Sequence, residues 1–335
     1  PFRRYQIGKV YRGEKPQKGR FREFYQCDID IIGDGELSII NDAEIPSVIY
    51  NIFKELGLGD FTIRINNRKI LNGLFSKIGE KEKSVHIMRI IDKIDKIGRE
   101  AVKEEIEKLG INSKEIMDFI SIEGNNDEKL YKLEKINIDN DIFKKGIEEL
   151  KEVVKYIRLF GIPEENFKID LTIARGLDYY TGTVYETFLN EYKELGSVCS
   201  GGRYENLAEN YINRKLPGVG VSIGLTRLFY KLNELNILNV EQNSIAKALV
   251  LSMDDDNKRA IEVGTILRKQ GINVQIYMEN KKSKAKFKYA DKMNIPYAII
   301  IGEEEKNTGK VSLKNMETGE QEILEIDQVI LKLKK

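Results

Sequence analysis

Residues 5–31 have the sequence YQIGKVYRGEKPQKGRFREFYQCDIDI and contain two segments typical of strands, joined by a loop. Residues 5–11 and 24–31 are rich in aromatic and β-branched side chains, and residues 13–19 supply two glycines and a proline. This pattern predicts a pair of antiparallel strands with a flexible loop between them.

The second of these segments carries polar side chains on one face. In a strand, alternate residues share a face, so Phe24, Gln26, Asp28 and Asp30 lie together. An aromatic ring, an amide and two carboxylates make a poor core but a suitable pocket floor. The ring can stack on a base, while Gln26 and Asp30 can receive an ammonium or imidazolium group. The alternative is an exposed polar face of an antiparallel sheet.

The chain begins with a local excess of positive charge. Residues 1–22 hold eight lysines and arginines against one glutamate, although the 55 basic and 54 acidic residues of the whole chain leave only +1. The near balance argues against bulk binding of polyanions. Arginines at the mouth of a hairpin suit a polyphosphate or the end of an RNA, because a guanidinium binds phosphate oxygens in pairs. The alternative is a solvated basic face.

Length and composition limit the remaining possibilities. The 335 residues are enough for about two domains, and a hydrophobic share of 41% is typical of a globular protein. One histidine and two cysteines exclude a Cys/His zinc cluster within the chain and a disulfide framework, so we expect no metal site and a cytoplasmic location. No apolar run has the length of a membrane span, and we expect no membrane partner.

Hydrophobic periodicity divides the rest of the first 235 residues into three regions. A strand between two helices is predicted first, then a mostly helical region, then short strands that end in a helix. The predicted elements are helices at 45–56 and 68–75 about a strand at 61–65; helices at 91–109, 113–121 and 141–159; strands at 167–174, 183–189 and 197–200; a helix at 204–211; and residues 218–224 leading into a helix through residue 232.

A new module begins after an asparagine-rich linker at residues 233–245. Strands and helices alternate there as β-α-β-α-β, which predicts a small parallel sheet with crossover helices. Residues 281–289 interleave lysines with aromatic rings, a pattern that suits contact with phosphates and stacking on bases, or alternatively a solvated helix face. The predicted elements are strands at 247–253, 274–278 and 297–301 and helices at 254–270 and 283–293.

Three further stretches combine cations, phenols and glycines. RGLDYYTG at residues 175–182 offers directional hydrogen bonds, and GGRY at residues 201–204 indicates a flexible turn with a cation. GVGVSIGLTR at residues 218–227 places glycines where the backbone can pack beneath a flat ligand. None of the three has the spacing of a phosphate loop or a dinucleotide fingerprint.

Taken together, these stretches resemble one family. Residues 11–26 resemble motif 2 of the class II aminoacyl-tRNA synthetases in its histidyl form, and residues 218–227 resemble class II motif 3. Residues 175–186 resemble the histidine-specific motif of the histidyl-tRNA synthetases. The resemblance spans nearly the whole chain, and its Arg-Gly-Leu-Asp-Tyr-Tyr element is specific to the histidyl family.

The resemblance implies an α+β fold with a six-stranded antiparallel class II catalytic core. The core would consist of residues 1–76 and 147–235. Residues 77–146 would form a helical insertion domain that grips the acceptor stem of the tRNA. Residues 246–335 would form a C-terminal α/β anticodon-binding domain.

The resemblance also implies an activity, the ATP-dependent formation of histidyl-adenylate and the transfer of histidine to the 3′ end of tRNA(His). Mg²⁺ would accompany ATP, and the family's enzyme would be a homodimer. Arg12 and Arg175 would be catalytic; the ATP site would comprise Arg12, Glu14, Arg20, Phe24 and Arg227; and the histidine site would comprise Gln26, Asp30, Arg175, Tyr179 and Tyr180.

Two non-catalytic alternatives share this fold, the regulatory subunit of ATP phosphoribosyltransferase and a histidine- or RNA-binding module. Residues 175–180 and the C-terminal module argue against the first, and the set Arg12, Arg175 and Arg227 argues against the second. The family also carries a helix-strand motif 1 and an Arg-Pro-Glu-Gly-Thr-like strand before motif 2, and neither occurs in this sequence. We therefore expect the chain to lack the N-terminal part of the family's fold.

Overall fold

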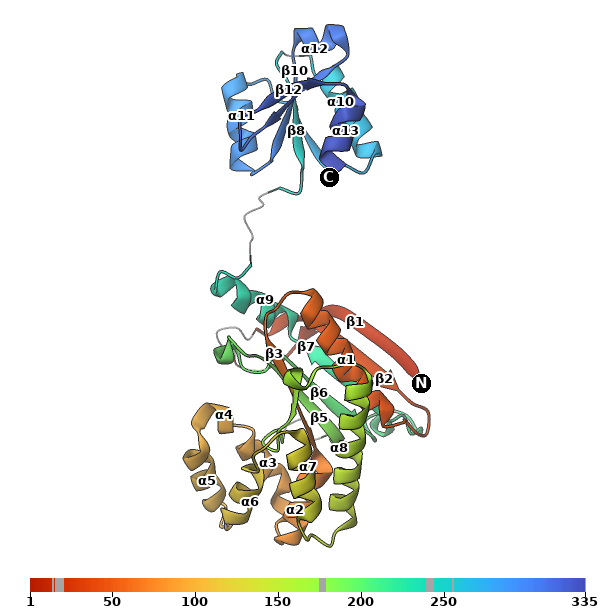
Figure 1. Cartoon of the computed structure of the whole chain (residues 1–335), viewed down its shortest axis with the longest axis vertical. Coiled ribbons are helices and arrows are strands. Elements are labelled where there is room, and N and C mark those ends of the chain that lie inside the picture. Colours follow the sequence, from red (N-terminus) through yellow and green to blue (C-terminus); the bar gives the residue numbers. More distant parts are fainter. Residues whose placement is uncertain (14, 16–20, 175–178, 239–243, 255, 335) are drawn as a thin grey trace. The chain divides into compact units, whose positions relative to one another are not determined.

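The computed structural model describes residues 1–334 apart from residues 14, 16–20, 175–178, 239–243 and 255 (Figure 1). The chain divides into two units, Pro1–Leu235 and Asn236–Lys335, and each unit is described by itself. The predicted linker spans the division between them.

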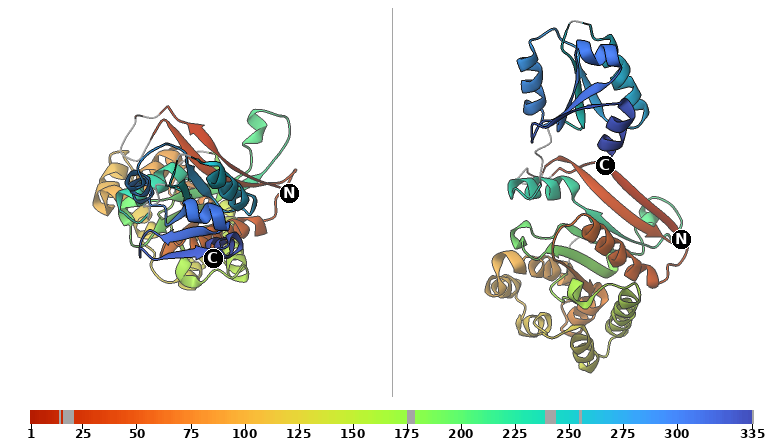
Figure 2. Two further views of the ribbon diagram at one scale, coloured as in Figure 1. Left: turned by 90° about the horizontal axis from the view of Figure 1, so that it is seen from above. Right: turned by 45° about the horizontal axis from the view of Figure 1, so that its top comes forward.

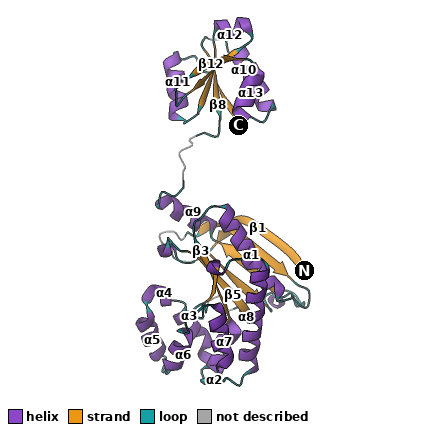
Figure 3. Cartoon of the chain, viewed as in Figure 1, coloured by secondary structure: helices purple, strands orange, loops and turns teal. Residues whose placement is uncertain are grey.

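The first unit is built on a seven-stranded sheet in the order β1-β2-β7-β6-β5-β3-β4. Figure 3 colours its strands orange and the surrounding helices purple. Neighbouring strands are antiparallel except β3 and β4, which are parallel. The predicted antiparallel core is confirmed, and the short strand β4 is an addition to the six strands that the resemblance implies. The strands are β1 Phe2–Tyr11, β2 Glu23–Ile32, β3 Phe61–Asn67, β4 Phe167–Ile169, β5 Tyr180–Leu189, β6 Cys199–Tyr204 and β7 Gly218–Ile223.

Helices α1 (Ile40–Glu55), α2 (Arg68–Lys77) and α8 (Asp141–Leu159) cover one face of this sheet, as two views show (Figures 1 and 2). Asp42 connects α1 to strand β5 on the covered face. The Thr183 hydroxyl donates to its carboxylate at 2.7 Å, and the Tyr185 hydroxyl donates to its backbone carbonyl at 2.6 Å. Side chains alternate along β5, so Glu186 lies on the opposite face. That opposite face is more open, and it carries the polar residues of β2.

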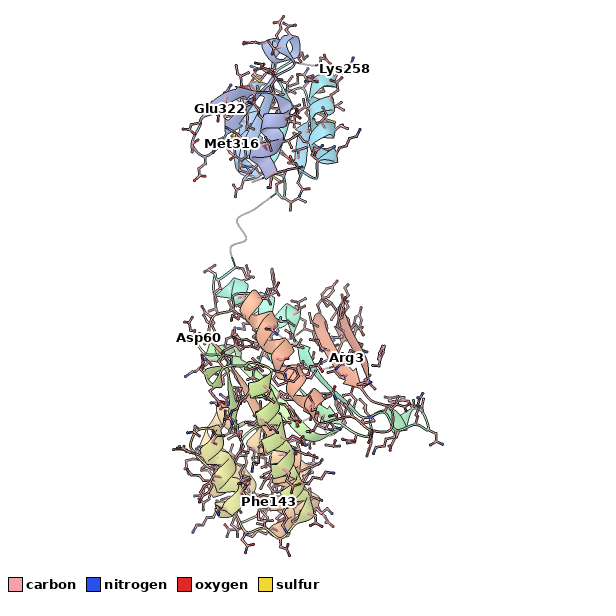
Figure 4. The ribbon with its side chains drawn as sticks, turned by 45° about the vertical axis from the view of Figure 1, so that its right-hand side comes forward. Arg3, Asp60, Phe143, Lys258, Met316 and Glu322 are labelled. Atoms are coloured by element: carbon pink, nitrogen blue, oxygen red, sulfur yellow. The ribbon has the colours of Figure 1, made fainter. Side chains whose placement is uncertain are left out.

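Two glycines allow α2 and α8 to cross closely. A Cβ at Gly73 would lie 2.5 Å from the Cβ of Phe143, which Figure 4 labels, and a Cβ at Gly146 would lie 2.8 Å from the backbone nitrogen of Ile70. Only glycine fits at both positions without displacing backbone atoms. The buried ring of Phe143 also packs against Phe119 of the helical region, with 6.2 Å between ring centres, so the start of α8 contacts that region as well as α2.

The region between residues 77 and 150 is helical and contains no strand, as predicted. The single helix predicted at 91–109 is wrong, because Gly98 adopts a φ of +82° and breaks the run. Helices α3 and α7 were not predicted; α7 begins with a capping box between Asn125 and Glu128. The helices are α3 Ser84–Ile91, α4 Ile94–Ile97, α5 Arg99–Glu107, α6 Lys114–Ile120 and α7 Asn126–Lys135. No helix in the described part of the chain is long and apolar enough to cross a membrane.

Two predicted elements of the core differ from the structure. The strand at 167–174 ends at Ile169, because the carboxylate of Asp170 accepts from the N–H of Thr172 at 3.0 Å and forms a turn. The helix at 204–211 does not form, since Tyr204 pairs with Gly218 in the β6–β7 ladder and only a short 3₁₀ turn, Ala208–Asn210, follows. The predicted helix after residue 224 is present as α9, Leu225–Glu234.

The second unit is a five-stranded sheet in the order β12-β11-β10-β8-β9. The three predicted strands are present and parallel, but an antiparallel hairpin, β11–β12, extends the sheet and was not predicted. Alternate residues of β8 enter separate apolar clusters, one with α10 and α13 and the other with α11. The elements are β8 Ala248–Ser252, α10 Lys258–Lys269, β9 Val274–Tyr277, α11 Ser283–Lys292, β10 Tyr297–Ile301, α12 Glu303–Thr308, β11 Val311–Asn315, β12 Gln321–Leu324 and α13 Ile326–Lys334.

The lysine-aromatic run at residues 281–289 lies mainly on α11. Its rings Phe287 and Tyr289 pack against the second apolar cluster, so they serve the core of the unit rather than an exposed stacking surface. Lys286 is buried as well, and its Nζ donates to the carbonyl of Ser252 at 2.6 Å. The exposed members of the run are therefore Ala285 and four lysines, at positions 281, 282, 284 and 288.

Candidate active site

Arg12 directly follows β1 and lies at the mouth of the β1–β2 hairpin. Its backbone N–H donates to the carbonyl of Arg22 at 2.9 Å, which closes the hairpin before the loop. Its Nη2 donates to Gln26 Oε1 at 3.0 Å, and its guanidinium carbon lies 5.1 Å from the centre of the Phe24 ring. Three predicted site residues are thus in one place.

Gln26 is held from its other end as well. Its Nε2 donates to Asp28 Oδ1 at 3.0 Å and to the hydroxyl of Ser222, which lies on the neighbouring strand β7. The β2–β7 register places Asp28 directly opposite Ser222, so the three side chains share one face of the sheet.

Asp30, two residues further along β2, is half-buried and has two partners. The Tyr204 hydroxyl donates to Asp30 Oδ1 at 3.1 Å, and Arg4 Nε lies 3.4 Å from Asp30 Oδ2. Burial raises the pKa of Asp30 above its usual value, while the hydrogen bond from Tyr204 and the charge of Arg4 act in the opposite direction. Burial and the neighbouring Asp30 carboxyl also raise the pKa of Tyr204, which therefore remains a hydroxyl donor.

The glycines of β7 make room for these side chains. A Cβ at Gly220 would lie 2.2 Å from Asp30 Oδ1, and a Cβ at Gly218 would lie 2.3 Å from Cζ of Tyr204. Our interpretation of these glycines as a floor for a flat ligand is therefore corrected, because protein side chains fill the space above both. The glycine spacing still follows from the site, since alternate residues of a strand face the same way.

A group of phenol rings lies beside Asp30. The rings of Tyr179 and Tyr180 have centres 4.6 Å apart, and the Tyr179 ring lies 6.2 Å from that of Tyr204. Tyr180 is paired with Tyr204 across β5 and β6. Tyr204 was not predicted as a site residue, because residues 201–204 were interpreted as a turn and 204–211 as a helix. Its position two residues after Gly202 would have been the signal if the predicted strand at 197–200 had been extended to Tyr204.

Arg227 lies in the first turn of α9, which is fastened to β2 because the N–H of Tyr25 donates to the Thr226 hydroxyl at 2.8 Å. The Arg227 guanidinium donates to the carbonyl of Leu195 at 2.6 Å and to that of Ser197 at 3.5 Å. These carbonyls belong to the segment that leads into β6. The other predicted residues, Glu14, Arg20 and Arg175, lie outside the described part of the chain.

Arg203, which we interpreted as a cation on a flexible turn, is a buried structural residue. Its Nη1 lies 2.7 Å from Asp42 Oδ1, and its Nε lies 2.7 Å from a Glu205 carboxylate oxygen. Burial raises the pKa of Asp42 to about 6, although Arg203 and a hydrogen bond from Thr183 oppose this shift. The pair joins α1 to β6 beneath the sheet, on the face opposite to Asp30.

The open face can bind a zwitterion with a basic side chain. Arg12 offers a guanidinium for a carboxylate or a phosphate, and the amide oxygen of Gln26 beside it can accept from an ammonium group. Asp30 with its surrounding phenols can accept from and donate to a planar nitrogen heterocycle. Phe24 supplies an aromatic surface at the outer end of the same face.

Comparisons with known proteins show which proteins this chain resembles. A family model described as histidyl-tRNA synthetase matches residues 1–228, and one described as anticodon binding domain matches residues 239–335. A histidine–tRNA ligase of Clostridium tetani is 57% identical over 334 residues, which cover 98% of this chain and 76% of the relative. One of Finegoldia magna is 50% identical over 337 residues, which cover 100% of this chain and 78% of the relative.

Solved structures show the same likeness. The crystal structure of histidyl-tRNA synthetase from Nostoc sp. PCC 7120 has a TM-score of 0.92 at 42% identity and covers 100% of this chain and 78% of that chain. A structure from Bacillus halodurans, described as an ATP phosphoribosyltransferase regulatory subunit/histidyl-tRNA synthetase, has a TM-score of 0.69 at 23% identity, which is a likeness of fold alone.

Proposed function

The chain belongs to the histidyl-tRNA synthetase family, and from this premise we propose how its residues activate histidine and transfer it to tRNA(His). It is a ligase that uses ATP, histidine and tRNA. The observation that carries the proposal is the contact of Arg12 with Gln26 beside Phe24, on the face that also holds Asp30. This arrangement matches a substrate with an ammonium, a carboxylate and an imidazole.

In the first step, a carboxylate oxygen of histidine attacks the α-phosphorus of ATP, and the bond to the leaving pyrophosphate breaks. Charge neutralisation and alignment are the main contributions of the protein to such a displacement. Arg12 and Arg175 neutralise the α-phosphate from two sides, and Arg12 also holds the substrate carboxylate. Mg²⁺ enters with ATP, bound to the β- and γ-phosphates as part of the substrate.

The adenine ring lies between Phe24 and Arg227, and Glu14 accepts from its amino group. Arg20 and Arg227 hold the distal phosphates. Arg227 now donates to the carbonyls of Leu195 and Ser197, and in the proposal it exchanges one or both of these bonds for ATP. Since the guanidinium of Arg12 already lies over the Phe24 ring, the aromatic surface and the phosphate ligand are adjacent before ATP binds.

Histidine is selected by polar partners for each of its groups. Gln26 accepts from the α-ammonium group, Asp30 and Tyr180 bind the two imidazole nitrogens, and Tyr179 lines the pocket together with Tyr204. A pocket of this kind discriminates strongly, because a wrong side chain leaves buried polar groups unpaired. The hydrogen bond from Tyr204 to Asp30 supports the assignment, since it fixes the carboxylate that faces the imidazole.

In the second step, the terminal ribose hydroxyl of the tRNA attacks the carbonyl carbon of the adenylate, and AMP leaves. We assign the catalytic core to residues 1–76 and 147–235, contact with the acceptor stem to residues 77–146, and the anticodon contact to residues 246–335. The exposed lysines of α11 support the last assignment, because they offer charge for phosphates.

We also propose that the full-length protein is a homodimer that works in the cytoplasm. The support for an assembly is the face of β1 on which Tyr5, Ile7 and Tyr11 are exposed, together with Lys9. Apolar side chains grouped in this way are typical of a contact surface. The support for the location is the low cysteine content of the sequence.

Histidine-dependent exchange of pyrophosphate into ATP tests the proposal, measured on the full-length protein with each amino acid in turn. We expect exchange with histidine alone, and we expect Arg12→Ala to lower it by about 100-fold or more, because a guanidinium aimed at developing charge is removed. Arg214→Ala is the matched control, since Arg214 pairs with Asp34 on the surface. Normal exchange in Arg12→Ala would contradict the catalytic role, and a wild-type protein that binds histidine without exchange would favour the regulatory subunit instead.

A further inference from the structure

Both the oxygen and the nitrogen of the Gln26 carboxamide are hydrogen-bonded to protein groups. Its oxygen accepts from Arg12 at 3.0 Å, and its nitrogen donates to Asp28 at 3.0 Å and to the Ser222 hydroxyl. An amide nitrogen has two hydrogens, so two acceptors satisfy it completely. The oxygen has two lone pairs and, within the described part of the chain, uses one for Arg12, which leaves the other for a ligand.

These partners determine which way the amide points. A carboxamide fits its site almost equally well in two orientations that exchange oxygen and nitrogen, and hydrogen bonding decides between them. Arg12 can only donate and a carboxylate at Asp28 can only accept, so the orientation with oxygen toward Arg12 is favoured at both ends. The hydroxyl of Ser222 accepts from the same nitrogen. Because a hydroxyl can donate as well as accept, Arg12 and Asp28 select the orientation, and Ser222 holds the amide in place.

The strand register brings these acceptors to Gln26. Asp28 is directly opposite Ser222 in the β2–β7 ladder, and Gln26 lies two residues from Asp28 on the same face. Diagonal neighbours at this separation are within reach of a long side chain. The arrangement therefore depends on β7 as much as on β2, although Ser222 is distant from Gln26 in sequence.

We propose that Ser222, together with Asp28, is a positioning residue that fixes the carboxamide of Gln26 with its oxygen toward the substrate's α-ammonium group. The inference rests on the proposed function, because it assigns the free lone pair of Gln26 to the ammonium of histidine. If the amide turned over, its NH₂ group would face the ammonium, and a donor would oppose a donor. Ser222 thus acts on amino-acid affinity through Gln26 and has no effect on ATP.

The test is a comparison of Ser222→Ala and Ser222→Thr in the full-length protein. Pyrophosphate exchange gives KM for histidine and for ATP, and inhibition is measured with histidinol and with imidazole-4-propionate, which lacks the ammonium group. For Ser222→Ala we expect the histidine KM and the histidinol Ki to rise about fivefold, the cost of one lost hydrogen bond. The ATP KM and the Ki of imidazole-4-propionate stay unchanged, and Ser222→Thr, which keeps the hydroxyl, restores the wild-type values.

A second background separates positioning from a structural effect. In Gln26→Ala, the further change Ser222→Ala should leave the histidine KM unaltered, because the group through which Ser222 acts is absent. Thr62→Val is the matched control. Thr62 lies on strand β3 of the same sheet, and its hydroxyl, which the substitution removes, donates to Asn190 Oδ1 at 2.9 Å. The substitution should change none of these constants.

Three results would overturn the inference: an unchanged histidine KM in Ser222→Ala, equal changes for histidine and ATP, or an effect that persists without Gln26. If the wild-type protein showed no histidine-dependent pyrophosphate exchange, the proposed function would be contradicted, but the role of Ser222 could still be tested. In that case calorimetric titration with histidinol decides, and equal affinity of the wild type and Ser222→Ala, or no binding by either, contradicts the role of Ser222.

Discussion

Asp30 illustrates how much the neighbours of a residue decide its chemistry. Its position on the polar face of β2 follows from strand alternation, and the sequence alone predicts that much. Its ionisation depends on groups from other strands, because burial raises the pKa of Asp30 while Tyr204 and Arg4 lower it. A carboxyl that must accept from an imidazole N–H at neutral pH therefore depends on Tyr204, which lies 174 positions away.

Tyr204→Phe removes the hydroxyl that donates to Asp30. We expect the histidine KM to rise about five- to tenfold with little change in the ATP KM, because one hydrogen bond to a charged group is lost. The pKa of Asp30 then rises further, so the fall of kcat/KM for histidine on acidification begins at a higher pH than in the wild type. Pyrophosphate exchange across a pH series measures both effects.

The control for this substitution is Tyr131→Phe, which removes the hydroxyl of an exposed tyrosine on α7. It should leave the KM values and the pH profile unchanged. If kcat/KM for histidine fell at the same acidic pH in Tyr204→Phe as in the wild type, Tyr204 would not support the ionised form of Asp30.

Strand β7 contributes to the site through two glycines, whose missing side chains leave space for other residues. Its glycines at 218 and 220 leave room for Tyr204 and Asp30, and its Ser222 fills the third position of the same face. The sequence predicts only a glycine-rich segment that leads into a helix, and the strand itself was not predicted. The sequence does not say which side chains fill the space, because these come from β2 and β6, and only the order of the strands makes them neighbours.

Gly220→Ala tests this account of β7. The added methyl would lie 2.2 Å from Asp30 Oδ1 and 2.6 Å from the carbonyl oxygen of Ile29, so Asp30 and the backbone of β2 must move. We expect a loss of roughly 1–3 kcal/mol in the free energy of unfolding, as for other overpacked sites, together with a higher histidine KM. Urea denaturation and pyrophosphate exchange are the measurements.

Gly224→Ala is the matched control in the same segment. Its Cβ would have as its nearest neighbour the Cβ of Arg227, at 3.8 Å, and its φ is −74°. Stability and histidine KM should be close to those of the wild type. If both variants lost the same amount of stability, the loss would come from the reduced backbone freedom of alanine, and Gly220 would not be needed to make space for Asp30.

At the scale of the whole molecule, the two units have separate cores. The second unit buries the alternate faces of β8 in two apolar clusters of its own. Its parallel strands were predictable, because continuous apolar runs alternate with helical ones. Its β11–β12 hairpin was not predicted, since short strands at a sheet edge leave a weak pattern in the sequence.

Leu267→Ala tests the independence of the second unit. Leu267 is fully buried among residues of that unit, so the substitution should cost it about 2–5 kcal/mol. Calorimetry should show one transition moved to lower temperature and the transition of the first unit unchanged. Histidine-dependent pyrophosphate exchange should be retained, whereas charging of tRNA should fail at lower temperature than in the wild type. Loss of exchange together with charging would contradict separate folding units.

The sequence by itself determined the class of the fold, the residues of β2 that face the site and the family to which the chain belongs. These conclusions depend on local pattern, namely alternation, helical spacing and short motifs, which a chain expresses before it folds. Only the tertiary structure decided that Tyr204 and Ser222 support Asp30 and Gln26, and that Arg203 is buried against Asp42. The reason is that these contacts join strands distant in sequence, and their geometry arises from the order and register of the sheet.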